Sequence, residues 1–156
     1  MRRLFPILAL VAVLSLVVGL IAPGTDLGSL QFLEFVAIVW THSLAAIDLE
    51  STGRRIEAMA ISVGLPDWVR AQSEKNRRKA SFYLCLSLPM FPLLTMAQAK
   101  GLVHGEWLIG LLGLNLAFQV GAFVGEFAIM AAQARLVGDV EEWVKEPDAL
   151  LVDSNL

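Results

Sequence analysis

Formal charge is nearly absent from four long stretches of this 156-residue chain. The four stretches are residues 4–21, 30–47, 82–99 and 107–132, and Glu34 and Glu126 carry their only formal charges. A helix that crosses a bilayer needs about 20 mainly apolar residues, and each stretch is close to that length. The scarcity of charge therefore predicts an all-α integral membrane protein, in which four transmembrane helices form two hairpins of a helical bundle.

Cysteine and histidine are also scarce. The single cysteine, Cys85, excludes a disulfide within the chain, and its apolar surroundings predict a small buried side chain. The two histidines are His42 and His104. They fall near opposite ends of the predicted spans, so we do not expect them to share one metal ion or one haem within a single chain.

No pattern typical of catalysis is present. The sequence has no glycine-rich phosphate loop, and neighbouring polar residues on one helix, such as His42, Ser43 and Asp48, do not converge as a triad does. The basic residues lack interleaved aromatic side chains, which argues against nucleic acid as a partner. We therefore expect a protein that is not an enzyme, and the sequence leaves any cofactor unknown.

The basic residues indicate the orientation in the membrane. Seven of the 12 Lys and Arg residues lie between the second and third stretches, and Lys100 is the only one in the two turns on the other side. The positive-inside rule then places both termini and the segment 49–79 in the cytoplasm, with the inner membrane of a bacterium as the predicted location. The first apolar run, of about 18 residues, is longer than a signal-peptide core of about 7–15 residues, so we expect a retained helix.

These observations predict a transmembrane domain of residues 1–134, followed by an acidic cytoplasmic tail of residues 135–156. The spans are expected at about residues 4–22, 28–48, 80–99 and 106–133. The segment 49–79 is predicted to be a cytoplasmic loop that is partly helical. Tight turns are expected at residues 23–26, which contain Pro, Gly and Asp, and at residues 100–106, which contain Lys, Gly and Glu.

The fourth stretch carries two different faces. Small residues recur every four positions along one ridge: Gly113, Ala117, Gly121 and Gly125. Such spacing lets another membrane helix approach closely. A polar stripe lies nearly opposite and consists of Asn115, Gln119, Glu126 and Gln133. Because lipid does not satisfy these groups, we expect the stripe to face protein or water.

The second and third stretches add further candidates. Glu34, Thr41 and His42 share one broad face of the second stretch, and Pro89 and Pro92 predict a kink in the third. By helical rise, His42, Cys85 and Glu126 fall at a similar depth, within about 5–14 Å of the inner boundary. His42 and Glu126 are interpreted as a hydrogen-bonded network between helices, as a proton or cation site, or as a contact with a partner subunit or cofactor.

Three hypotheses for function follow. The first is a small non-catalytic membrane subunit in the lipid bilayer that packs with itself, as a homo-oligomer, or with larger membrane partners. The second is a bundle that translocates protons or cations through Glu126 and His42. The third is an anchor subunit of a membrane oxidoreductase, with His42 as a haem ligand or quinone partner.

Overall fold

The computed structural model describes residues 4–21, 27–102 and 105–145, and four α-helices account for nearly all of them. These helices are α1 (Leu4–Ile21), α2 (Leu27–Val63), α3 (Asp67–Ala99) and α4 (Gly105–Lys145). The described part of the chain has no β-strand, which confirms the all-α prediction. The predicted turn at 23–26, His104 and the last eleven residues, 146–156, lie outside the described residues.

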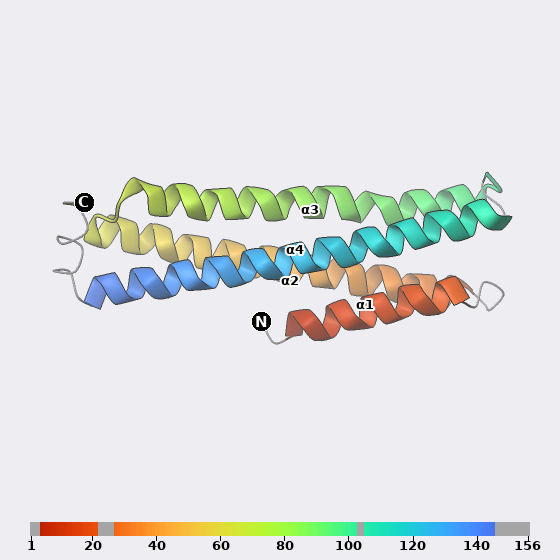
Figure 1. Ribbon diagram of the computed structural model, residues 1–156, viewed down its shortest axis with the longest axis horizontal. Coiled ribbons are helices and arrows are strands. Elements are labelled where there is room, and N and C mark those ends of the chain that lie inside the picture. The colour runs from red at the N-terminus through yellow and green to blue at the C-terminus, as the bar shows by residue number, and fades with distance from the viewer. Residues whose placement is uncertain (1–3, 22–26, 103–104, 146–156) are drawn as a thin grey trace.

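The helices pack side by side along one long axis (Figure 1). α2 and α4 contact each other in the middle, and both contact α1 and α3. α1 is much shorter than the others, with 18 residues against 37, 33 and 41 in α2, α3 and α4. It covers only one half of the bundle, and its N-terminal end lies near the middle of the molecule.

The three long helices exceed one bilayer thickness. At 1.5 Å per residue, α4 is about 60 Å long, whereas a hydrocarbon core is about 30 Å thick. The segment 49–79, predicted as a partly helical loop, is the continuation of α2 and the beginning of α3, joined by residues 64–66. Gly64 ends α2 with φ 70°, and its N–H donates to the carbonyl of Ala60 at 3.1 Å.

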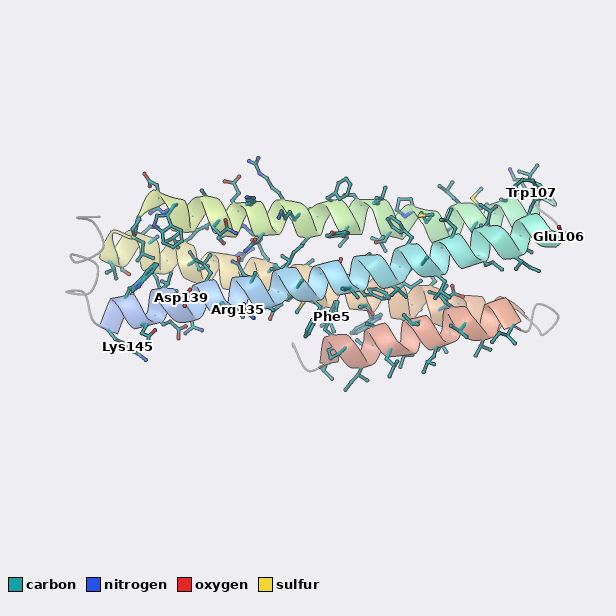
Figure 2. The ribbon with its side chains drawn as sticks, in the orientation of Figure 1. Phe5, Glu106, Trp107, Arg135, Asp139 and Lys145 are labelled. Atoms are coloured by element: carbon teal, nitrogen blue, oxygen red, sulfur yellow. The ribbon has the colours of Figure 1, made fainter. Side chains whose placement is uncertain are left out.

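The short length of α1 divides the bundle into two halves. The apolar half contains α1 with residues 27–48, 80–99 and 105–132 of the other helices. The charged half contains residues 49–63, 67–79 and 133–145. Figure 2 labels Arg135, Asp139 and Lys145 on the part of α4 that extends past α1, while Glu106 and Trp107 lie at the opposite end.

Each half has its own buried apolar cluster. In the apolar half, Phe5 and Leu16 of α1 are buried against Ile38 of α2 and Phe123 of α4. In the charged half the cluster joins all three helices and contains Ile56, Ala60, Leu65, Val69, Leu136, Val137 and Val140. α4 continues through residue 134 without a break, so the part of the predicted tail up to Lys145 is a packed helix.

Within the described residues, two helices are long and apolar enough to cross a membrane, by length and composition. They lie within Phe32–Val63 and Gly105–Lys145, and a shorter apolar helix covers Leu4–Val18. This criterion supports two of the four predicted spans. α3 continues as one helix through Pro89 and Pro92, as its unbroken ribbon in Figure 1 shows.

Candidate functional site: a buried histidine–glutamate pair

Polar side chains from three helices meet inside the apolar half. α2 contributes His42, α3 contributes Ser87, and α4 contributes Gln119 and Glu126. Gln119 and Glu126 are seven residues apart, so they share one face of α4, about 10 Å apart along its axis. His42, Ser87 and Gln119 are 0% exposed and Glu126 is 1% exposed, so all four side chains are removed from the surface.

His42 uses both ring nitrogens. Its Nδ1 lies 2.7 Å from Oε1 of Glu126. Its Nε2 lies 2.8 Å from Oγ of Ser87 and 3.3 Å from Oε1 of Gln119. Ligation of a haem iron by His42 would therefore require one of these interactions to break.

The hydrogen bonds around Nε2 fix where its proton lies. The Ser87 hydroxyl donates its only hydrogen to the carbonyl of Tyr83 at 2.7 Å, so its oxygen is left to accept. Nε2 of Gln119 donates to the carbonyl of Ser87 at 3.1 Å, which turns the amide oxygen of Gln119 toward His42. With the Ser87 hydrogen donated to Tyr83, both neighbours of His42 Nε2 are acceptors, and this arrangement places a hydrogen on Nε2.

The short Nδ1–Oε1 contact requires a second hydrogen. Without one, a lone pair of the ring would face a carboxylate oxygen at 2.7 Å. The pair therefore holds two hydrogens, either as imidazolium with carboxylate or as imidazole with carboxylic acid. The net charge is zero in both arrangements, which is the least costly state inside an apolar bundle.

Aromatic rings close one side of the pair. The ring of Phe123 lies 5.1 Å from that of His42, measured between centroids. Phe5 of α1 then packs edge-on against Phe123 at 6.4 Å and stacks on Phe127 at 6.2 Å. Phe5 lies at the start of α1, near the middle of the bundle (Figure 2), so α1 seals the site from this direction.

A crevice reaches the pair from another direction. Its volume is about 200 Å³, and its lining residues are His42, Ala46, Leu49, Glu50, Arg77, Ala80, Ser81, Leu84 and Glu126. Two buried atoms of these side chains, Glu126 Oε2 and Arg77 Nε, have no hydrogen-bond partner within the described residues. An acceptor and a donor that both lack partners thus line one crevice.

Arg77 is held in place at the crevice by two carboxylates of α2. Its Nη1 lies 3.3 Å from Oε2 of Glu50, and its Nη2 lies 2.9 Å from Oε1 of Glu57. The side chain passes so close to Gly53 that a Cβ there would be 3.1 Å from Cδ of Arg77. The absence of a side chain at Gly53 therefore makes room for the guanidinium group.

A second polar cluster lies farther along α4, where the two halves meet. Gln133 donates to Oγ of Ser73 at 2.7 Å and accepts from Nδ2 of Asn76 at 2.9 Å. All three side chains are buried. This cluster joins α3 to α4 without a titratable group, so its role is to fix the packing of the two helices.

The structure places the whole predicted polar stripe inside the bundle. Asn115 is buried, and both its amide atoms lack partners within the described residues. Thr41 is buried and donates back to the carbonyl of Ala37 at 2.7 Å. Glu34 is buried as well, eight residues before His42 on α2. Gln119 and Glu126 meet His42, whereas Gln133 belongs to the second cluster.

The small-residue ridge does not form one continuous contact. A Cβ on Gly125 would lie 2.7 Å from Cζ of Tyr83, so this glycine admits a ring of α3. A Cβ on Gly113 or Gly121 would meet nothing within 4 Å, and Ala117 is exposed. The larger part of the ridge therefore faces away from the chain's other helices.

The prediction for Cys85 is wrong, because its side chain is exposed. Ser87 and Tyr83 point toward the other helices, and the helical turn then directs Cys85 outward. Sequence reasoning also missed Ser87 and Arg77. Ser87 could have been found in the sequence, because its hydroxyl group lies within an apolar stretch. Arg77 could not be distinguished from the other basic residues around it.

No protein-family model matches the chain, and no curated protein and no solved structure is significantly similar to it. Among the described residues, no group of three or more His, Cys, Asp and Glu side chains is arranged to hold a metal ion.

Proposed function

We propose that all four helices of the apolar half cross a membrane, with the charged half in the cytoplasm. The distribution of side chains supports this. Large apolar side chains point outward from every helix of this half, among them Leu10, Phe32, Phe82 and Val124, which are 58%, 68%, 63% and 65% exposed. The buried side chains of the same half include a histidine and two glutamates. An apolar exterior around a polar interior suits lipid as the surroundings.

We propose further that this membrane protein carries protons and that the His42–Glu126 pair takes them up and releases them. The observation that carries the proposal is Oε2 of Glu126, which is buried and lacks a partner within the described residues, in a side chain that lines the crevice. A proton added at Oε2 gives the pair one positive charge. Loss of the shared hydrogen gives it one negative charge.

Polar groups also lie on the side of the pair that faces away from the charged half. They favour the transfer of protons across the bundle over the storage of a proton at the pair. Gln119 touches His42, and Asn115 follows one turn farther along α4, about 16 Å from Glu126 by helical rise. Its buried amide lacks a partner within the described residues, an arrangement that is costly in a dry interior and favours water. We propose that protons cross the apolar half along this line of groups.

Proton flux into liposomes tests the proposal. The purified chain is reconstituted, a pH gradient is imposed, and the internal pH is followed with a trapped dye. Glu126→Gln keeps the shape of the side chain but carries no exchangeable carboxyl proton, so we expect flux to fall by about 100-fold or more. Glu142→Gln makes the same change at an exposed position of α4 and serves as the control.

Two results would contradict the proposal. One is a wild-type flux no greater than that of empty liposomes. The other is an unchanged flux in Glu126→Gln when circular dichroism and size-exclusion chromatography show that the variant is folded.

A second candidate function is that of a membrane subunit that packs with itself or with a larger partner. The part of the ridge at Gly113, Ala117 and Gly121 favours this. Ala117 and Gly121 are exposed, Gly113 is partly exposed, and a helix of another chain fits closely against small residues. Native mass spectrometry of the chain extracted in mild detergent tests it. A stable monomer without bound protein would contradict this candidate and leave proton transfer standing.

A further inference from the structure

We infer that the crevice between α2 and α3 is a hydrated access route that connects the His42–Glu126 pair with the charged half, and that Arg77 and its two carboxylate partners form its mouth. This inference rests on the proposed proton transfer and adds the direction of access and the charged residues at its opening.

The lining of the crevice supports hydration. Liquid water occupies about 30 Å³ per molecule, so a volume of about 200 Å³ holds several molecules. The side chains of Glu126 and Arg77 line this space, and Glu126 Oε2 and Arg77 Nε lack partners within the described residues. Each gains a hydrogen bond from water, and a chain of water molecules between them connects a buried carboxyl group with the surface.

The position of Arg77 marks the end of the crevice that faces the charged half. Arg77 precedes Ser87 by ten residues on α3, which is about 15 Å along the helix axis. Its side chain is 28% exposed and is paired with Glu50 and Glu57. Two carboxylates outnumber one guanidinium there, so the mouth of the crevice carries a net negative charge that favours cations over anions.

Adjacent residues provide a matched pair for a labelling experiment. Leu84 lines the crevice, whereas Cys85, the next residue, is exposed on the outside of the apolar half. The variant Leu84→Cys in a Cys85→Ser background moves the single thiol from the outer surface into the crevice at nearly the same depth. Ala46→Cys in the same background places a thiol in the crevice from α2. This variant is used if Leu84→Cys does not fold.

The first readout is the rate at which water-soluble methanethiosulfonate reagents modify each thiol in liposomes. We expect the anionic sulfonate reagent to modify Leu84→Cys at least about 100-fold faster than Cys85 of the wild type, the factor that corresponds to the cost of a charge in lipid. An apolar maleimide is expected to modify Cys85 readily. The cationic reagent should react with Leu84→Cys faster than the anionic one, because the mouth carries a net negative charge, and Arg77→Gln should widen this difference.

The second readout is proton flux after modification. Labelled Leu84→Cys should lose most of its flux, and wild type labelled at Cys85 with the maleimide should retain it. Equal rates of charged-reagent modification at the two positions, no dependence on Arg77, or full flux after complete labelling of Leu84→Cys would each overturn the inference. If unlabelled wild type carries no flux, the proposed function itself fails, and the labelling rates still report whether the crevice is hydrated.

Discussion

The two halves of the bundle have opposite distributions of polarity. In the charged half, Ile56, Val69 and Val140 are fully buried, and most charged side chains lie at the surface. In the apolar half, His42 and Glu126 are among the most deeply buried residues, and large apolar side chains such as Phe82 face outward. The same three long helices run through both halves, so each helix reverses which of its faces is polar.

This reversal explains what holds each half together. In the proposed arrangement, water drives apolar side chains inward in the charged half, whereas lipid around the apolar half supplies no such drive, because its tails are as apolar as leucine. Packing and hydrogen bonds between helices must therefore contribute more in the apolar half. The His42 network connects α2, α3 and α4 through hydrogen bonds of their side chains, and in the proposed arrangement it lies where apolar burial contributes least.

The largest effect is expected from a charge placed in the apolar cluster of the charged half. Val69 is fully buried, so Val69→Asp should lower the free energy of unfolding by more than about 4 kcal/mol. Ala71→Asp introduces the same group two residues later at an exposed position and should change it by less than about 0.5 kcal/mol. Denaturant unfolding in detergent micelles, followed by circular dichroism, measures both. Similar effects of the two variants would show that the charged half has no water-driven core.

The next effect concerns the buried pair. Either His42→Leu or Glu126→Leu leaves one polar partner without its bond inside the bundle, and each should cost about 3 kcal/mol. The double variant removes both groups and should recover most of that loss, because leucine packs well in an apolar interior. A double-mutant cycle on unfolding free energies measures the coupling. If the double variant loses as much as the sum of the single ones, the pair does not act as a unit.

Two glycines of α4 give a smaller and more local comparison. Gly125→Ala places a methyl group 2.7 Å from the ring carbon Cζ of Tyr83, so the ring must shift, at a cost of about 1 kcal/mol. Gly121→Ala meets nothing within 4 Å and should stabilise the helix by about 0.5–1 kcal/mol. Unfolding in detergent measures the change in unfolding free energy for each variant, and the two changes should have opposite signs. If Gly121→Ala is destabilising instead, another chain packs on this ridge in the detergent-extracted protein.

The sequence predicts which residues share one face of a helix better than it predicts which helix that face contacts. The period of small and polar residues along α4 is visible in the sequence, and His42 and Glu126 could be placed at a similar depth by helical rise. The rotation of α3 about its axis could not be predicted, since its apolar residues do not mark one side. For that reason Ser87 was missed and Cys85 was placed inside. The length of α2 was underestimated because its charged continuation resembles a loop.

The smallest effect is expected at the surface of the charged half. Nη2 of Arg55 lies 2.7 Å from Oε1 of Glu141, and the two side chains are 62% and 35% exposed. Water screens such a pair, so a double-mutant cycle with Arg55→Gln and Glu141→Gln should give a coupling below about 1 kcal/mol that decreases further in high salt. The distance equals that between His42 and Glu126, so the contrast isolates the effect of burial. A coupling energy as large as that of the buried pair would contradict this expectation. It would mean that the distance between the two charged groups, and not their burial, sets the coupling energy.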